Sequence, residues 1–246
     1  MADTHQFDVN RLFGVQDYVA VITGGGTGIG LMAAQALSAN GAKVYITGRR
    51  KEVLENAAKS HQPTKGGGQI IPIGPCDATS KDDIENLVVE LSKKEKYINL
   101  LICNAGISGP KAEPKYAEAD DLKAQLWNNE DPTDWQDNFN TNVTAVYFTT
   151  VAFLPLLQAA IRPKGPLEPY SSSVITISSM SGIMRHAQGH FSYNTAKGAT
   201  IQLTKLMSAE FQKAQIRVNS IAPGYFPSES EYRFSLFINP IYHDIM

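Results

Sequence analysis

The feature that most constrains this chain is a glycine-rich turn between a short β-branched run and an apolar helical pattern. Tyr18–Thr23 has the composition of a strand, and the seven residues after it, Gly24–Gly30, include five glycines. Apolar residues then recur at helical spacing until Asn40-Gly41, a pair suited to end a helix. This order of strand, glycine turn and helix indicates the first unit of an α/β fold.

Strand-like and helix-like segments continue to alternate along the chain. The runs that indicate five further strands are Lys43–Thr47, Gln69–Ile73, Asn99–Cys103, Val174–Ser178 and Ile216–Ala222. Helical periodicity separates them over Glu52–Lys59, Ser80–Leu91, Phe139 to Pro155 or shortly after, and Ser192–Lys213. Crossover helices return the chain to the same edge of a sheet, so the strands should pair in parallel. Six strands fit the doubly wound order 3-2-1-4-5-6 of a Rossmann-type fold, in one domain over residues 1–246.

Two polar stretches interrupt the alternation. Ser108–Asp134 and Arg162–Ser172 are rich in proline, charged and polar residues. We interpret both as surface insertions, the first with a short helix around Asp121–Trp127.

In an open parallel sheet a ligand binds beyond the carboxyl ends of the strands, where the strand order reverses. Candidate site residues should therefore follow strands directly.

Composition narrows the classes of function. A chain of 246 residues, 43% of them hydrophobic, can bury a large core, and its net charge of −2 gives no general attraction for nucleic acid or an anionic membrane. No run approaches the ~18 apolar residues of a membrane span. Cys76 and Cys103 are expected to be reduced thiols, and His186 and His190 lack a third metal ligand of suitable spacing. We expect a soluble, cytoplasmic protein without a metal, nucleic acid or membrane partner.

The glycine turn is suited to a dinucleotide. Gly24, Gly28 and Gly30 lie where missing side chains let backbone N–H groups and a helix N-terminus approach a pyrophosphate. A plain flexible turn is the alternative, and the spacing G-x-x-x-G-x-G differs from the more common G-x-G-x-x-G. The position between a strand and a helix favours the dinucleotide.

The end of the second strand indicates which dinucleotide. An NAD site usually carries an acidic residue there to accept the ribose hydroxyls, but this chain has Thr47-Gly48-Arg49-Arg50-Lys51. The planar guanidinium of Arg49 suits a 2′-phosphate, with Arg50 and Lys51 as helpers. A solvated basic turn is the alternative. The pattern favours NADP(H), and the same missing acid argues against a Rossmann-like methyltransferase.

A tyrosine and a lysine four residues apart point to proton transfer. Tyr193 and Lys197 should lie on one face of a helix, where the ammonium and a positive nicotinamide ring would lower the phenol pKa from about 10 toward neutrality. Ser179 ends the preceding strand and is placed to hydrogen-bond a substrate carbonyl. Chance alone supplies about one such Tyr/Lys pair in a chain like this, so its context matters more. Ser178 and Ser181 are alternatives to Ser179.

In combination these motifs resemble the classical short-chain dehydrogenase/reductase family from Asp8 to Ser228. The matching residues are Thr23-Gly24-x-x-x-Gly28-Ile29-Gly30, Asp77, Asn104-Ala105-Gly106, Asn142, Ser179, Tyr193-x-x-x-Lys197 and Pro223-Gly224. The resemblance implies an oxidoreductase that transfers a hydride between NADPH and a ketone or aldehyde, or a secondary alcohol in reverse.

The resemblance also implies a role for individual residues. Asp77 would lie near the adenine, Asn104 by the adenosine ribose and Lys197 on the nicotinamide ribose. Asn142 would hold a water that links Lys197 to solvent, while Ser179 and Tyr193 bind the reacting oxygen. The candidate catalytic residues are Asn142, Ser179, Tyr193 and Lys197. The candidate cofactor-binding residues are Thr23, Gly24, Gly28, Ile29, Gly30, Arg49, Asp77, Asn104, Ala105, Gly106, Tyr193, Lys197, Pro223 and Gly224.

The resemblance ends before the C-terminus. Family members continue after Pro223-Gly224 through a substrate loop, a helix and a seventh strand, whereas only Tyr225–Met246 follow here. We expect the short, divergent tail, residues 229–246, to lack that seventh strand and to leave the sixth as an exposed edge. The alternative function is therefore a truncated NADP(H)-binding protein, weakly active or inactive, with a regulatory or binding role.

Association of subunits is also expected. In the family, two helices equivalent to Trp135–Leu157 and Ser192–Lys213 pair with their copies in a second subunit. Here both carry apolar residues over a wide arc, among them Val146, Val151, Leu203 and Leu206. We expect a homodimer or homotetramer, and the sequence does not name the substrate.

Overall fold

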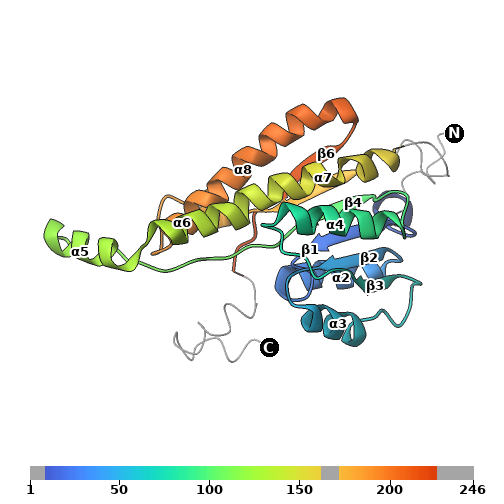
Figure 1. Cartoon of the computed structure of the whole chain (residues 1–246), viewed down its shortest axis with the longest axis horizontal. Helices are drawn as coiled ribbons and strands as arrows, with labels where there is room; N and C mark the ends of the chain where they lie inside the picture. The colour runs from blue at the N-terminus through green and yellow to red at the C-terminus, as the bar shows by residue number, and fades with distance from the viewer. Residues whose placement is uncertain (1–8, 162–171, 226–246) are drawn as a thin grey trace.

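Six parallel strands form one sheet in the order β3-β2-β1-β4-β5-β6. A computed structural model of the chain describes residues 9–161 and 172–225 (Figure 1). The strands are β1 (Val19–Thr23), β2 (Lys43–Thr47), β3 (Gln69–Pro72), β4 (Leu100–Cys103), β5 (Ser173–Ile177) and β6 (Arg217–Ile221). The expected doubly wound, Rossmann-type order is confirmed.

The central strand explains why the site residues meet. Strand β1 lies between β2 and β4 and all five of its residues are buried, as its unbroken β-branched run predicts for a strand covered on both faces. Its last residue, Thr23, is paired with Thr47 at the end of β2 and with Cys103 at the end of β4. The turns that follow these three strands therefore lie together at one edge of the sheet.

Helices cover both faces of the sheet (Figure 1). Helices α2 (Gly28–Ala39) and α3 (Lys51–Ser60) pack on one face, where Ala34 and Leu54 join Ile22 and Ile46 in a buried cluster. The other face is covered by α4 (Lys81–Ser92), α7 (Ala145–Ala159) and α8 (Phe191–Phe211), and its cluster contains Leu91, Phe153 and Met207. A short helix, α1 (Val9–Phe13), precedes β1.

The helix expected from Phe139 to Pro155 or shortly after begins earlier than its periodicity suggested. It begins as α6 (Pro132–Phe139), continues through a π-helical turn, Asn140–Thr144, and runs as α7 to Ala159. Pro155 does not end it, because this proline lies on the exposed side of α7 and water can solvate the carbonyl that its missing N–H leaves unpaired.

The same helical run is unusually apolar for its length. Pro132–Ala159 has the length and hydropathy of a membrane span, although its sequence has no long uninterrupted apolar run. Within it, Phe153 and Leu157 are fully buried against the sheet. Part of its apolar surface thus belongs to the protein core, while other apolar side chains, such as Tyr147, are exposed.

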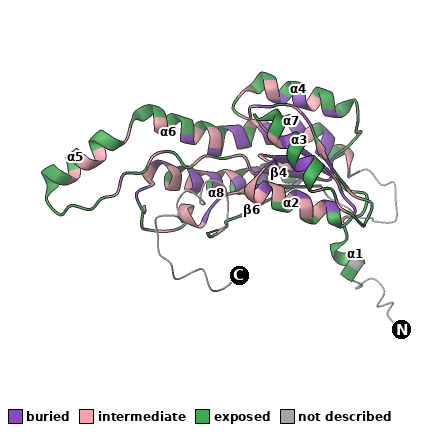
Figure 2. Cartoon of the chain, turned by 90° about the horizontal axis from the view of Figure 1, so that it is seen from below, coloured by how far each residue is buried: buried purple, intermediate pink, exposed green. Residues whose placement is uncertain are grey.

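The first insertion contains the expected helix, and α5 (Ala119–Asn129) has no buried residue. Figure 2 shows it at the end of the molecule, away from the sheet. Residues 162–171 of the second insertion and the tail from 226 lie outside the described residues, so the expectation of a missing seventh strand is not addressed. Within the described chain β6 is the edge of the sheet, and Ile221 at its end is 51% exposed.

Candidate active site

A cleft of about 860 Å³ opens at the carboxyl edge of the sheet. Segments that follow β1, β2, β3, β4 and β5 line it, together with α8 and the π-helical turn. Of the sixteen residues expected in the site, fourteen line this cleft: Thr23, Gly24, Ile29, Arg49, Asp77, Asn104, Ala105, Gly106, Asn142, Ser179, Tyr193, Lys197, Pro223 and Gly224. The other two, Gly28 and Gly30, form the start of α2 directly behind the wall.

The glycine turn has the backbone that an anion site needs. Gly24 and Gly28 have φ angles of +63° and +52°, a region that favours glycine. A Cβ on Gly30 would overlap with the carbonyl oxygen of Gly24, so only glycine allows α2 to pack this closely on the turn. Thr27 caps α2 without a side-chain hydrogen bond. The N–H groups of its first turn therefore face the cleft without a side-chain cap, as a pyrophosphate site requires.

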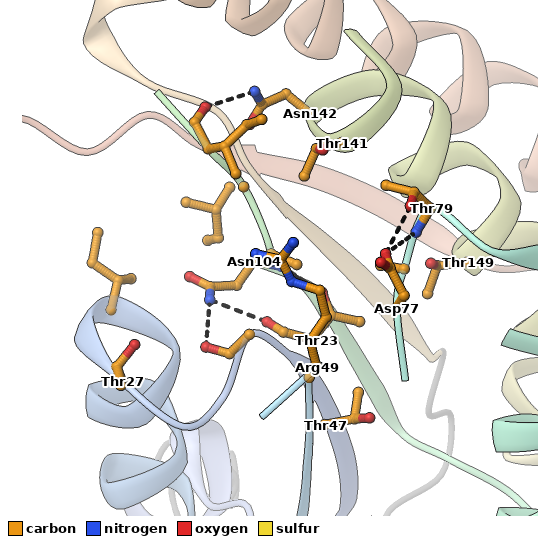
Figure 3. A pocket seen from close by; sticks show the side chains of 18 of the residues that line it. Thr23, Thr27, Thr47, Arg49, Asp77, Thr79, Asn104, Thr141, Asn142 and Thr149 are labelled. Atoms are coloured by element: carbon orange, nitrogen blue, oxygen red, sulfur yellow. Dashed lines mark hydrogen bonds between the residues drawn. The ribbon is translucent and has the colours of Figure 1, made fainter. Parts of the chain in front are cut away.

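Asn104 braces the glycine turn. Its side-chain nitrogen donates to the carbonyl oxygens of Thr23 and Gly24 at 3.1 and 3.0 Å (Figure 3). The backbone N–H groups of Asn104 and Ala105 both donate to the Thr23 hydroxyl, at 3.0 and 3.1 Å. The sequence resemblance suggested contact with a ribose, and the structure adds that this side chain ties β4 to the turn after β1.

Arg49 and Asp77, which follow β2 and β3, both line the cleft (Figure 3). Hydrogen bonds from the backbone N–H and hydroxyl of Thr79 lower the pKa of the Asp77 carboxyl, and the nearby charge of Arg49 adds to the effect. No acidic residue within the described lining lies at the end of β2. The guanidinium of Arg49 and the carboxylate of Asp77, which is held by hydrogen bonds from Thr79, thus both line this end of the cleft.

Ser179, Tyr193 and Lys197 come together at the other end of the cleft. Lys197 is only 5% exposed; its Nζ donates to the carbonyl of Ile177 at 2.8 Å and lies 5.7 Å from the centre of the Tyr193 ring. Burial lowers the pKa of the Lys197 ammonium to about 8. The i, i+4 spacing on α8 therefore places the cation beside the phenol, as expected.

The structure also separates Ser179 from its neighbours. The Ser178 hydroxyl donates to the carbonyl of Ile221 at 3.0 Å and accepts from Ser220 at 2.8 Å, which engages it in joining β5 to β6. Both serines line the cleft, but the Ser179 hydroxyl does not join two strands and accepts one backbone N–H, from Ser181 at 3.1 Å. Ser179 is the better placed of the two to bind a substrate oxygen.

Asn142 occupies the π-helical turn and has one unsatisfied atom. Its Nδ2 donates to the carbonyl of Ile107 at 2.8 Å and to Asn138 Oδ1 at 3.1 Å, while its own Oδ1 is buried without a partner (Figure 3). The Asn142 carbonyl accepts from the Thr200 hydroxyl of α8 at 2.8 Å. A buried, unpaired acceptor is the kind of group that an ordered water satisfies.

Gly182 supports the arrangement of the site, and the sequence analysis did not identify it. A Cβ at this position would lie 2.6 to 2.8 Å from backbone atoms of Lys197 and Gly198. The 3₁₀ turn Met180–Gly182 therefore packs directly on the backbone of α8. This contact joins the segment that follows Ser179 to the helix that carries Tyr193 and Lys197. A glycine shortly after a strand was the available signal, but a single sequence does not show what approaches it.

Among the described residues no three His, Cys, Asp or Glu side chains cluster in a way that could hold a metal ion. The ring of His190 packs edge to face on Tyr193, with centroids 6.4 Å apart. Cys76 and Cys103 are free and buried, and burial raises the pKa of each thiol to about 12. Both thiols are therefore unreactive at neutral pH.

Comparison with known sequences and structures agrees with this geometry. The sequence profile described as short chain dehydrogenase matches residues 18–235. The chain is 45% identical over 221 residues to the short-chain dehydrogenase/reductase PhomF of Diaporthe leptostromiformis, covering 89% of this chain and 73% of that protein. It is 40% identical over 247 residues to the short-chain dehydrogenase/reductase VdtF of Byssochlamys spectabilis, with 92% and 79% covered.

Among solved structures, the RhlG/NADP active-site complex of Pseudomonas aeruginosa is similar, with a TM-score of 0.76 and 29% identity over 93% of this chain and 80% of that one. A short-chain type dehydrogenase/reductase from Mycobacterium marinum has a TM-score of 0.73 and 30% identity over 89% and 78% of the two chains.

Proposed function

The chain belongs to the short-chain dehydrogenase/reductase family of oxidoreductases, and from this membership we propose that it is an NADP(H)-dependent carbonyl reductase or, in reverse, an alcohol dehydrogenase. One observation carries the proposal: a single cleft joins the glycine turn and Arg49 to Ser179, Tyr193 and Lys197. The cofactor end and the proton-transfer end are thus parts of one continuous site. The substrate is a small or medium-sized ketone or aldehyde.

The residues present fit the cofactor. The N-terminus of α2 with the Gly24–Gly30 turn would hold the pyrophosphate, Arg49 the 2′-phosphate, and Lys197 the nicotinamide ribose. The remaining candidates for cofactor contact are Thr23, Asp77, Asn104, Ala105, Gly106, Tyr193, Pro223 and Gly224. When bound, the nicotinamide supplies the hydride for reduction or accepts it in the reverse reaction.

The side chains at the other end of the cleft would handle the proton. The Ser179 hydroxyl donates a hydrogen bond to the substrate carbonyl oxygen, and the phenol of Tyr193 gives its proton to the same oxygen as negative charge develops there. The positive charge of Lys197 stabilises the resulting phenolate. The unpaired Oδ1 of Asn142 holds a water through which the proton is replaced from solvent.

A direct assay tests the function. In the forward assay, loss of NADPH absorbance is followed with a panel of aliphatic, cyclic and aromatic ketones and aldehydes. In the reverse assay, the gain of NADPH absorbance is followed with the corresponding secondary alcohols and NADP⁺. The rival that the sequence leaves open is an NADP(H)-binding protein with little activity. Tight NADPH binding with no turnover of any carbonyl would support that rival.

We predict that Arg49→Ala weakens NADPH binding by roughly ten- to a hundredfold, the equivalent of about 1.5–3 kcal/mol for one charge-assisted contact. NADH has no 2′-phosphate, so its dissociation constant should change little. Fluorescence titration of both cofactors at fixed ionic strength measures the ratio. Lys94→Ala is the matched control, because it removes the same charge from an exposed side chain that pairs with Glu90 and lies outside the described lining of the cleft. Equal weakening of NADPH and NADH would show that Arg49 does not read the phosphate.

We also propose that the chain forms a homodimer or homotetramer through α7 and α8. Of the apolar residues that suggested this interface, Val146 is buried in the core of its own subunit and Leu203 packs against that core. Tyr147 and Leu206 remain 41% and 55% exposed and are the better candidates for an intersubunit contact.

Light scattering should therefore show a dimer or larger assembly at micromolar concentration. Leu206→Lys should shift it toward the monomer, because burying an unpaired ammonium in an interface is costly. Val89→Lys, an equally exposed apolar position on α4, should leave the assembly unchanged. A strictly monomeric wild type would refute the interface.

The free thiols of Cys76 and Cys103 support a reducing compartment, which we propose to be the cytoplasm.

A further inference from the structure

A second asparagine lies directly behind Asn142 and has no role in the proposed chemistry. Asn138, one helical turn earlier on α6, is 0% exposed. Its Oδ1 accepts from Asn142 Nδ2 at 3.1 Å, and its Nδ2 donates to the Ser192 hydroxyl at 3.1 Å and to the carbonyl of Asp134 at 3.3 Å. A fully buried amide is costly unless its polar atoms are paired, and here both are.

The surroundings leave one orientation for each amide. A backbone carbonyl only accepts hydrogen bonds, so the carbonyl of Asp134 requires the nitrogen of Asn138 to face it. The oxygen of Asn138 must then point to Asn142 and accept from its nitrogen. The carbonyl of Ile107 makes the same demand on that nitrogen. Both N–H groups of Asn142 are thereby used on one side, and its Oδ1 is turned to the other.

That other side is the space above Gly106. A Cβ placed on Gly106 would lie 2.7 Å from Asn142 Oδ1 and 3.4 Å from Lys197 Nζ, so the two atoms face a common point. The direction in which Asn142 Oδ1 points therefore decides whether a bridging water reaches Lys197. With a less constrained amide, the nitrogen would occupy that direction part of the time and would repel the ammonium.

The loop after β4 holds Asn138 in place. Gly109 has a φ of +67°, and a Cβ there would overlap with Asn138 Nδ2 and lie 3.5 Å from the Ser192 hydroxyl. Gly109 also lines the cleft. The backbone of the cleft wall thus packs directly on this amide, and the amide in turn joins α6 to the first turn of α8, which carries Tyr193.

We propose that Asn138 is a positioning residue that fixes the side-chain orientation of Asn142 and so aims its Oδ1 at Lys197. The proposal rests on the proposed reductase function, because Asn138 would act in replacing the proton that the reduction consumes. Asn138 contacts neither the cleft nor the reacting atoms and acts only through Asn142.

The first test replaces the amide by an apolar side chain with the same number of heavy atoms. Asn138→Leu should lower the single-turnover rate of NADPH oxidation by about tenfold, because one buried N–H of Asn142 loses its acceptor. The NADPH dissociation constant should stay within about twofold, since no cofactor contact changes. Asn138→Asp keeps an acceptor for Asn142 and should stay within about threefold of the wild-type rate, although a buried carboxylate lowers its melting temperature.

Thr204→Val is the matched control for a merely structural effect. Thr204, on α8, is buried like Asn138. Its hydroxyl donates to the carbonyl of Thr200 at 2.8 Å and lies 2.7 Å from the Thr176 hydroxyl, and it has no hydrogen bond with Asn142. This variant should lose melting temperature and keep its rate. If the rates of Asn138→Leu, Asn138→Asp and Thr204→Val fall in proportion to their losses of melting temperature, the positioning role is wrong.

A double-mutant cycle gives the decisive result. In an Asn142→Ala background, Asn138→Leu should change the rate by about twofold or less, because the group through which it acts is gone. The melting temperatures of the cofactor-free proteins should be non-additive in the same way. Additive losses of rate in an active enzyme would overturn the inference alone. A wild-type protein that binds NADPH but reduces no carbonyl would contradict the proposed function, and the inference with it.

Discussion

Replacing Tyr193 by phenylalanine should lower turnover of a carbonyl substrate by ~10² or more, the upper part of the range for loss of a general acid. The side chain keeps its ring and its place on α8 beside Lys197, and only the proton donor is lost. NADPH affinity should change little, because the glycine turn, Arg49 and Lys197, which carry most of the proposed cofactor contacts, are unchanged. Steady-state rates and a fluorescence titration of the same protein measure the two quantities.

Tyr45→Phe is the matched control for this variant. Tyr45 lies in β2, and its hydroxyl donates to Glu95 at 2.7 Å, away from the described lining of the cleft. Its loss should reduce stability by about 1 kcal/mol, as for a typical hydrogen bond, without affecting turnover. If Tyr193→Phe retained near wild-type turnover, another group would have to deliver the proton, and Tyr193 would not be the general acid.

The inner strands were predictable because burial on both faces leaves a plain signal. Runs such as Val19–Thr23 and Leu100–Cys103 are unbroken and β-branched or aliphatic, and turn residues follow them. Parallel pairing then places the residues after each strand at one edge, which is why the sequence placed Gly24, Asn104 and Ser179 in one site. The local spacing of Tyr193 and Lys197 required only the period of a helix.

Other parts depended on contacts between distant segments. The start of α6 had a local signal, since Asp131 accepts from the N–H of Thr133 and Pro132 occupies the first helical position, but the helix lacked an apolar stripe there. The π-helical turn had no local signal, because its support comes from a distant residue: the hydroxyl of Thr200, 58 residues along the chain, donates to the carbonyl of Asn142. Asn138 likewise looked like an ordinary polar residue, and only the packing of α8 and the loop after β4 shows that it is buried.

Gly182 gives the second large effect that we expect. In Gly182→Ala the added methyl would meet backbone atoms of Lys197 and Gly198 at 2.6 to 2.8 Å, and backbone on both sides has little freedom to move away. Relief requires the 3₁₀ turn and α8 to separate, which moves Ser179 relative to Tyr193. A misplacement of about 1 Å at a reacting centre can cost about 10²-fold in rate. Overpacking should also cost about 1–3 kcal/mol of stability.

The control for this variant lies on the opposite side of the same contact. A Cβ on Gly198 would have only the carbonyl oxygen of Gly182 nearby, at 3.3 Å, so a shift of a few tenths of an ångström accommodates it. Alanine is also favoured over glycine inside a helix by about 1 kcal/mol, so Gly198→Ala should keep both rate and stability near wild type. Turnover and urea unfolding of the two variants separate the explanations. If Gly182→Ala lost stability but kept its rate, the distance between Ser179 and α8 would not be set by this contact, and the 3₁₀ turn would only support the fold.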